Sequence, residues 1–209
     1  MEKSVSSETG LREIAVFDFD HTLVQHDSFW SFMAAVAGWP RTLLAFAEAF
    51  LRLSIHSLRN RHDAIPDDPR TFIKAFLMEK LLGGKTLIQL KPAIELIKSK
   101  QQWVESVRAK LMDHHVKGRH IVIASGALDI YLSQLVIGLP HDALICTKAE
   151  TIDGIITGRM AEGNCVRQRK AEMLRDYMAA NGPFGESWGY GNYPHDVPML
   201  DLLKHRIIV

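Results

Sequence analysis

The sequence predicts an α/β protein, built as a doubly wound parallel sheet with a small all-helical domain inserted after the first strand. One observation is that an apolar run at 14–17 leads directly into acidic residues, while a second run at 121–124 ends in a small polar pair. Short uninterrupted apolar runs of this kind are typical of strands buried in a parallel sheet. Another is that strand patterns alternate with helical patterns after residue 118. This alternation favours parallel strands joined by crossover helices.

Residues 26–98 separate the first two strands, and their apolar positions follow helical spacing. We therefore expect a core domain made of 11–25 and 99–209, a helical domain at 26–98 and a flexible tail at 1–10. Within the helical domain, Asp27 or Ser28 is expected to cap the first helix, and Gly38-Trp39-Pro40 to end it.

The other elements follow from the same patterns. A charged segment with two prolines, 59–70, predicts a loop, and Gly83-Gly84 predicts the end of the helix after it. Residues 151–158 predict a hairpin with Asp153-Gly154 at its turn. Further strands are expected at 144–147, 187–190 and 206–209, and helices at 42–58, 72–81, 87–97, 103–118, 128–136 and 170–180.

Composition and charge exclude several classes of protein. The chain has 209 residues, of which 47% are apolar and 23% charged, as is ordinary for a globular protein. Its 25 Lys and Arg against 24 Asp and Glu leave it nearly neutral, so a nucleic-acid backbone is not expected as a partner. Cys146 and Cys165 are too few for a disulfide framework, and the polar first ten residues lack a secretory signal. We therefore expect a cytoplasmic protein.

The expected helix at 42–58 is apolar over most of its circumference. A membrane span is not expected, because the longest uncharged stretch of this region, 28–40, is much shorter than the roughly 20 residues that a spanning helix needs. Two locations stay open for the helix, namely the core of the helical domain and a membrane surface. We favour the core, because charged residues interrupt the apolar stretch.

Polar residues follow three of the predicted strands. Because the carboxyl ends of parallel strands meet at one edge of a sheet, their side chains should gather in a single crevice. The residues in question are Asp18, Asp20, Ser125, Asn192 and Asp196, and Lys170 joins them from a helix.

This set suits phosphoryl transfer, which needs a nucleophile, an acid for the leaving group, charge for the phosphoryl oxygens and usually Mg²⁺. Asp18 is ionised at neutral pH and can attack phosphorus without the help of a base. Asp20 can protonate the leaving group if burial and its carboxylate neighbour raise its pKa. Ser125 and Lys170 are the candidates to hold phosphoryl oxygens, and Asp196 and Asn192 to complete a Mg²⁺ site.

Four motifs occur in a fixed order: Asp18-Phe19-Asp20-His21-Thr22 at a strand end, Ser125 at the end of an apolar strand, Lys170, and an acidic motif at 191–200. In these motifs the chain resembles the haloacid dehalogenase superfamily phosphatases, of the subclass that includes phosphoserine phosphatase. The resemblance extends from about residue 11 to the end. It implies a Rossmann-like core, a helical cap that closes over the substrate, and an aspartyl-phosphate on Asp18. It also implies phosphate binding by Thr22, Ser125, Gly126 and Lys170, and Mg²⁺ binding by Asp18, the Asp20 backbone carbonyl, Asn192 and Asp196.

The chain departs from that family pattern at the metal site. Most relatives have Asp at the position of Asn192, so the predicted site loses one negative charge and weaker Mg²⁺ binding is expected. A non-catalytic binding protein is therefore an alternative. Arg167 or Arg169 can replace Lys170 as the phosphate ligand if the register of the helix differs by one turn.

We expect the substrate to be a small phosphorylated metabolite such as phosphoserine. Phosphoserine phosphatases have a Glu that helps to read the amino group of the substrate, and Asp27 falls near that place as a shorter acid. The stretch 25–32, with the apolar helix after it and Arg59 and Arg61, looks more like the phosphatidylglycerophosphatase C family, in which the insertion meets the membrane. A lipid phosphate at the membrane surface, reached through peripheral contact of the cap, is therefore the alternative.

Overall fold

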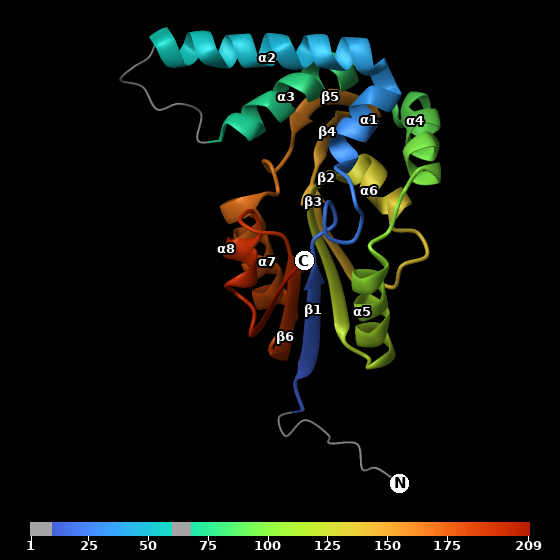
Figure 1. Cartoon of the computed structure of the whole chain (residues 1–209), viewed down its shortest axis with the longest axis vertical. Helices are drawn as coiled ribbons and strands as arrows, with labels where there is room; N and C mark the ends of the chain where they lie inside the picture. The colour runs from blue at the N-terminus through green and yellow to red at the C-terminus, as the bar shows by residue number, and fades with distance from the viewer. Residues whose placement is uncertain (1–9, 60–67) are drawn as a thin grey trace.

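The computed structural model describes residues 10–59 and 68–209, and its core is a sheet with the strand order β3-β2-β1-β6-β7 (Figure 1). All neighbouring strands of this sheet are parallel. The first strand, β1, lies at the centre. The strands are β1 (Arg12–Phe17), β2 (His120–Leu128), β3 (Ala143–Thr147), β6 (Phe184–Gly191) and β7 (His205–Ile208). The predicted doubly wound parallel sheet is confirmed.

Helices cover both faces of the sheet (Figure 1). Ala15 and Phe17 of β1 belong to one hydrophobic core, and Ile14 and Val16 belong to the other, because successive side chains of a strand point to opposite faces. All four are fully buried, which explains the uninterrupted apolar run. The first core is covered by α5 (Glu105–Val116) and α6 (Asp129–Leu135), and the second by α7 (Arg167–Asn181) and α8 (Val197–Leu200).

Four helices follow β1 and form a layer beyond the carboxyl ends of the strands (Figure 1). Asp27, one of the two expected caps, accepts hydrogen bonds from the N–H groups of Phe29 at 2.9 Å and Trp30 at 3.3 Å. Thr86 forms a reciprocal capping box with Gln89. The helices are α1 (Ser28–Ala37), α2 (Trp39–Arg59), α3 (Pro69–Leu82) and α4 (Leu87–Ser99).

The loop expected at 59–70 lies mostly outside the described residues, but its last part was wrongly assigned, because α3 begins at Pro69. Asp68 caps this helix by accepting a hydrogen bond from the Arg70 N–H at 3.2 Å. Proline suits the first helical position, where its missing N–H would have no partner. The Asp-Pro pair therefore starts a helix here.

A hairpin of β4 (Ala149–Ile152) and β5 (Ile155–Met160) joins the helical layer. Asp153 and Gly154 form its turn as predicted, with positive φ values of 51° and 77°. The hairpin lies against α3: a Cβ added at Gly158 would be only 2.5 Å from the Cα of Glu79. The layer beyond the strand ends therefore contains a small sheet in addition to the expected helices.

The side chains of α2 contradict the interpretation of 42–58 as a core helix. Ala45 and Ala49 are buried, with 3% and 0% exposure, whereas Leu44 and Leu51 are 71% and 59% exposed. In Figure 1, α2 lies across the outer end of the molecule, over α3. None of the helices in the described ranges has both the length and the apolar character that crossing a membrane requires.

Candidate active site

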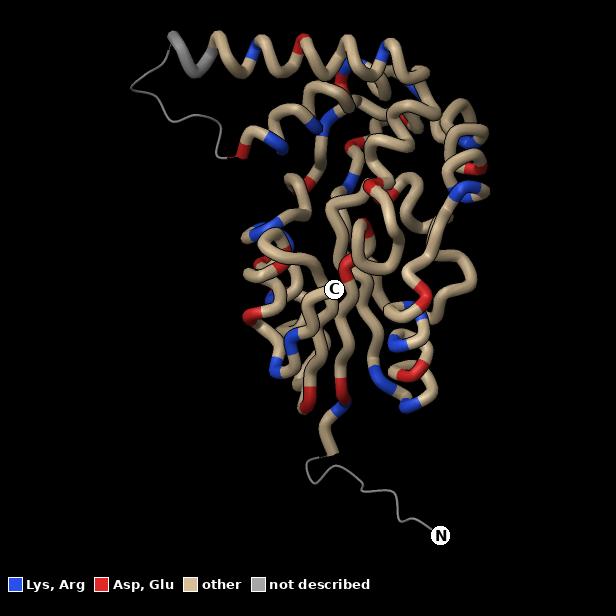
Figure 2. Tube along the Cα trace, viewed as in Figure 1, with Lys and Arg blue, Asp and Glu red and all other residues tan. Residues whose placement is uncertain are grey.

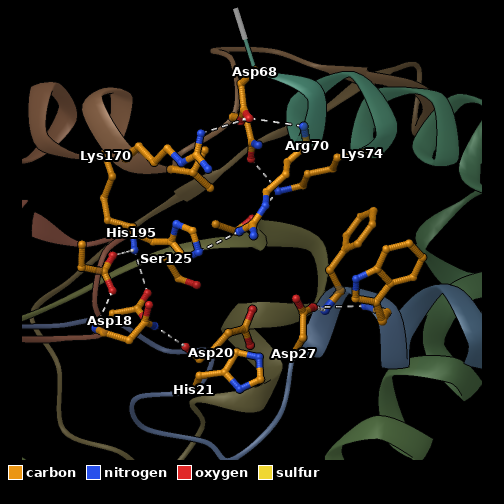
Figure 3. A pocket seen from close by; sticks show the side chains of 18 of the residues that line it. Asp18, Asp20, His21, Asp27, Asp68, Arg70, Lys74, Ser125, Lys170 and His195 are labelled. Atoms are coloured by element: carbon orange, nitrogen blue, oxygen red, sulfur yellow. Dashed lines mark hydrogen bonds and ion pairs between the residues drawn. The ribbon is translucent and has the colours of Figure 1, made fainter. Parts of the chain in front are cut away.

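The central position of β1 brings the predicted polar residues to one edge of the sheet. Phe17, at the end of β1, pairs with Ile123 of β2 on one side and with Tyr190 of β6 on the other. The residues beyond these strand ends, together with the helical layer, line a cavity of about 570 Å³ (Figure 3). The predicted site residues that line it are Asp18, Asp20, Ser125, Gly126, Lys170, Asn192 and Asp196.

Lys170 joins two of the predicted carboxylates. Its ammonium donates hydrogen bonds to Asp18 Oδ1 at 2.7 Å and to Asp196 Oδ1 at 2.6 Å, and all three side chains are buried. Burial raises the pKa of Asp18 to about 6, although Lys170 opposes this rise. Burial would lower the pKa of Lys170, but Asp18 and Asp196 outweigh it and hold that pKa above its usual range. At pH 7, Asp18 is therefore mostly ionised and Lys170 is charged.

Asp196 is held from its other side by the backbone. Its Oδ2 accepts a hydrogen bond from the Asn192 N–H at 2.9 Å. Gly191 leaves room for this arrangement, because an added Cβ would lie 2.7 Å from the Cβ of Asp196. Both carboxylate oxygens of Asp196 are therefore engaged, one by Lys170 and one by the chain itself.

The Asn192 side chain forms part of a group of oxygen donors beside Asp18. Its amide nitrogen lies 3.3 Å from Asp18 Oδ2 and 3.2 Å from the Asp20 carbonyl oxygen. Within the described residues, no three carboxylate, imidazole or thiolate side chains are grouped as metal ligands. A cation here would depend on a mixed set of a carboxylate oxygen, a main-chain carbonyl and the amide oxygen of Asn192, presented by turning that amide. These are hard oxygen ligands of the kind that Mg²⁺ takes, so the residues present fit this ion.

The Asp20 carboxylate is directed to the start of α1. It accepts hydrogen bonds from the Ser28 N–H at 3.0 Å and from the Ser28 hydroxyl at 3.1 Å. Burial raises the pKa of Asp20 to about 8, and the nearby charge of Asp27 adds to the rise. Asp20 is therefore mostly protonated at pH 7, whereas Asp18 is mostly ionised. Two carboxyl groups whose pKa values are pushed apart in this way suit the roles of proton donor and nucleophile.

Ser125 lies in a bulged end of β2. The pairing of β2 with β3 shifts between Ser125 and Leu128, so the strand runs past the end expected at Ala124. The Ser125 hydroxyl accepts a hydrogen bond from the Ala127 N–H at 3.0 Å. Gly126 is required here, because a Cβ would lie 2.8 Å from Val166 Cγ1.

The other candidates for phosphate binding differ in whether they line the cavity. Thr22 is fully buried and does not line the cavity, and its hydroxyl has no hydrogen-bond partner among the described residues. Of the three basic residues considered on the helix, Lys170 reaches Asp18. Arg167 lines the cavity beside Asp68, whereas Arg169 contacts Glu162 and Glu172 outside it.

Lys74 of α3, which is not among the predicted site residues, is a buried cation of the cavity wall. It donates hydrogen bonds to Asn164 Oδ1 at 2.7 Å, to Thr147 Oγ1 at 3.1 Å and to the carbonyl oxygen of Gly126. These acceptors use all three donors of an ammonium and belong to three separate segments. Burial lowers the pKa of Lys74 to about 8. The signal in the sequence is its place one turn before Leu77, on the buried face of an amphipathic helix.

Two arginines and a histidine line the α3 side of the cavity (Figure 3). Arg70 donates a hydrogen bond to His195 Nε2 at 2.9 Å, and Arg167 pairs with Asp68 at 3.3 Å. Burial lowers the pKa of His195, and both arginines lower it further, so the ring is neutral at pH 7. Arg167 has a φ of 48°, which strains a residue with a side chain. This side of the cavity is therefore cationic and suits a negatively charged group.

The rest of the wall is apolar. It contains Phe29 and Trp30 of α1, Phe46 of α2 and Ile73 of α3. The rings of Trp30 and Phe46 pack edge to face, with centroids 5.3 Å apart and an interplanar angle of 76°. The cavity thus combines an acidic floor, a cationic side and an apolar side.

Comparison with known proteins gives one family and several relatives. A model of the haloacid dehalogenase-like hydrolase family matches residues 15–201. The phosphoserine phosphatase SerB2 of Mycobacterium tuberculosis is 27% identical over 195 residues, which cover 90% of this chain and 42% of that protein. The chain therefore spans less than half the length of this curated relative.

Solved structures share the fold. A protein of unknown function from Bordetella pertussis superposes with a TM-score of 0.71 and 23% identity, covering 94% of this chain and 89% of that one. A substrate-bound phosphoserine phosphatase superposes with a TM-score of 0.63 and 14% identity, covering 94% and 85% of the two chains.

Proposed function

Because this chain belongs to the haloacid dehalogenase-like hydrolase family, we propose that it is a Mg²⁺-dependent phosphomonoester hydrolase with Asp18 as its nucleophile. The observation that carries the proposal is the difference between its two carboxyl groups. Asp18 is paired with Lys170 and mostly ionised, whereas Asp20 is held by Ser28 and mostly protonated. Nucleophile and acid are thus supplied from one strand end by two positions that Phe19 separates.

The reaction then proceeds in two steps. A carboxylate oxygen of Asp18 attacks phosphorus, the bond to the ester oxygen breaks, and Asp20 gives its proton to the departing alkoxide. Water next attacks the aspartyl-phosphate, and the Asp20 carboxylate takes a proton from that water. Inorganic phosphate leaves, Asp18 is free again and Asp20 is again protonated.

The other residues of the site bind and orient the phosphoryl group. Lys170 faces Asp18 and supplies positive charge, and Ser125 and Gly126 also line the cavity. Asp18, the Asp20 carbonyl and Asn192 would hold Mg²⁺, with Asp196 adjacent. When bound, the ion supplies charge that stabilises the phosphoryl oxygens.

We propose residues 26–98 as the cap domain and a small phosphorylated metabolite such as phosphoserine as the substrate. The cavity volume lies in the range of small-molecule sites. Asp27 uses Oδ1 to cap α1, which leaves its other oxygen for an ammonium group. Arg70 and Arg167 suit a carboxylate. Cys146 and Cys165 are both free and buried, in agreement with a cytoplasmic location, which we also propose.

A lipid phosphate is the second candidate substrate. It is favoured by the apolar wall of the cavity, to which Phe46 of α2 contributes. This wall suits the glycerol and acyl portion of a phospholipid better than it suits the charged groups of phosphoserine.

The proposal is tested by a phosphatase screen with Mg²⁺ on phosphoserine, sugar phosphates, histidinol phosphate and phosphatidylglycerophosphate. We expect hydrolysis of a generic aryl phosphate and of one class in this panel, and its complete loss in Asp18→Asn. Phosphate trapped on the wild-type protein should be absent from the variant. Wild-type protein that is inert with every ester would overturn the enzyme proposal in favour of the non-catalytic alternative.

A further inference from the structure

The helix α2 presents large apolar side chains to the outside and small ones to the protein. Ala45 and Ala49 point inward and allow close contact with the helices beneath. The outward side chains, which we call the outer face, are between 42% and 71% exposed. At 100° per residue they fall within a sector of about 160°. The outer face consists of Trp39, Leu43, Leu44, Phe50, Leu51 and Ile55.

Charged residues of α2 lie along one edge of this face. Glu48 is bound by Arg52 at 2.8 Å and by Lys80 of α3 at 2.6 Å. Arg41 is exposed, and the described residues offer it no ion pair. This edge therefore has three cations, Arg41, Arg52 and Lys80, and one carboxylate. Figure 2 shows uncharged stretches between the charged positions of α2.

We propose that the outer face of α2 docks on an anionic lipid surface, with the helix axis parallel to the membrane plane. A monomeric protein rarely leaves six large apolar side chains of one helix face exposed to water. A wide apolar face with aromatic residues and a cationic edge is the pattern of helices that lie in the membrane interface. From Trp39 to Ile55 the outer face extends over about 24 Å of the helix axis.

The charge of the helix edge favours lipid over a second copy of this chain. Two copies that paired antiparallel through α2 would bring two cationic edges together, whereas anionic headgroups complement that edge whichever way the helix lies. Docking would also place the cavity close to the lipid, because Phe46 of the same helix lines its wall. Docking needs no turnover, so it is independent of the proposed reaction.

Vesicle flotation tests the proposal on the full chain. We expect the wild-type protein to float with vesicles of phosphatidylglycerol and phosphatidylcholine, and to bind pure phosphatidylcholine at least tenfold less. The double variant Leu44→Glu/Leu51→Glu should lose binding at least tenfold. Val116→Glu/Ile137→Glu, which makes the same change at positions 82% and 59% exposed outside α2, should bind as the wild type does.

Four further measurements make the result decisive. Circular dichroism and hydrolysis of an aryl phosphate should be the same in the wild type and both variants, which shows that each is folded. Arg41→Glu should weaken binding to anionic vesicles severalfold. The proposal is overturned if the wild-type protein does not bind the anionic vesicles, or if the Leu44→Glu/Leu51→Glu variant still floats with them. A dimer in light scattering that the variant abolishes, without vesicle binding, shows instead that the outer face pairs two copies.

Discussion

The carboxylate of Asp20 is bound twice by Ser28, through the backbone N–H at 3.0 Å and through the hydroxyl at 3.1 Å. Ser28 is the first residue of α1, and its hydroxyl also lies 3.2 Å from the Tyr131 hydroxyl of α6. The proposed proton donor is therefore oriented by the inserted layer and by the core helix on which that layer rests.

Replacing Asp20 by Asn should separate the two halves of the reaction. We expect turnover to fall by about 10²- to 10⁴-fold, because an amide can neither give nor take the proton. A nitrophenolate leaves without a proton, so an aryl phosphate should still give a burst of one product equivalent, followed by slow hydrolysis of the phosphoenzyme. An alkyl phosphate should give no burst. Rapid-quench kinetics checks this, and unchanged steady-state turnover in Asp20→Asn would rule out the assigned role.

Lys74 should be needed for stability. Lys74→Met keeps much of the side-chain volume but removes the donor shared by Asn164 Oδ1, Thr147 Oγ1 and the Gly126 carbonyl. The single hydroxyl proton of Thr147 can then serve only one of the other two acceptors. We expect a loss of about 1–3 kcal/mol in the free energy of unfolding, measured by urea denaturation. Lys80→Met is the matched control on the same helix, because its exposed ion pair with Glu48 should be worth less than about 1 kcal/mol. Equal losses in the two variants would contradict the prediction.

Asn192→Asp should strengthen cation binding. The new carboxylate would stand beside Asp18 Oδ2 and the Asp20 carbonyl, where the amide now lies. We expect about tenfold tighter binding of Mn²⁺, followed by electron paramagnetic resonance, for each 1.4 kcal/mol that the added charge contributes. Without metal, repulsion from Asp18 should lower the melting temperature of the variant, and Mg²⁺ should restore it.

The matched control for this change is Asn181→Asp, at an exposed position at the end of α7. It alters the net charge equally but should leave Mn²⁺ affinity unchanged. If both variants bind Mn²⁺ as the wild type does, the proposed donor set beside Asp18 is incorrect.

His114 should make the protein sensitive to acid. It is buried, donates from Nε2 to the Tyr190 hydroxyl at 2.9 Å, and accepts from Arg119 at Nδ1. Burial, together with the charges of Arg119 and Lys117, lowers its pKa from 6.5 to about 4 against the opposing charges of Asp113 and Glu13. Between these two pH values the unfolded chain binds a proton that the folded chain does not, so stability falls as the pH drops from about 6.5 to about 4.

Urea denaturation at pH 7, 6 and 5 measures this effect. His114→Gln should be less stable than the wild type at pH 7, because the ring fills a core position, but its stability should fall less on acidification. His115→Gln, on the exposed side of the same helix, should keep the wild-type slope. An unchanged slope in His114→Gln would assign the acid sensitivity to other groups.

The residues at strand ends were predictable because parallel strands impose a simple rule. Asp18, Ser125, Asn192 and Asp196 each follow an apolar run, and the runs can pair only with their carboxyl ends at one edge. Lys170 was predicted from its place in the fixed order of the four motifs. The sequence predicted that burial and a neighbouring carboxylate would raise the pKa of Asp20, but it did not predict the contribution of Asp27.

The residues contributed by α3 were not predictable in this way. Lys74 meets Asn164, and Arg70 meets His195, only because α3 packs across the strand ends in one register, which no local pattern fixes. The orientation of α2 was predicted wrongly for a related reason. Its apolar residues surround most of the helix, and close packing selects Ala45 and Ala49 for the inner side, leaving the larger residues outside.

The strand order of the sheet also determines when the protein becomes active during synthesis. Ile14 pairs with His120 of β2, and Ala15 pairs with Trp188 of β6. The first strand to be synthesised, β1, can therefore pair only after strands that are synthesised much later. Until β6 has emerged, one edge of this strand, which is apolar from Ile14 to Phe17, lacks its neighbour and is a target for chaperones or for aggregation. Asn192 and Asp196 follow β6 directly in the sequence. The strand that completes the pairing of β1 is therefore synthesised just before the last residues of the site. Nascent chains that stop before β6 should therefore be both inactive and prone to aggregate, and the appearance of activity should mark the completion of the fold.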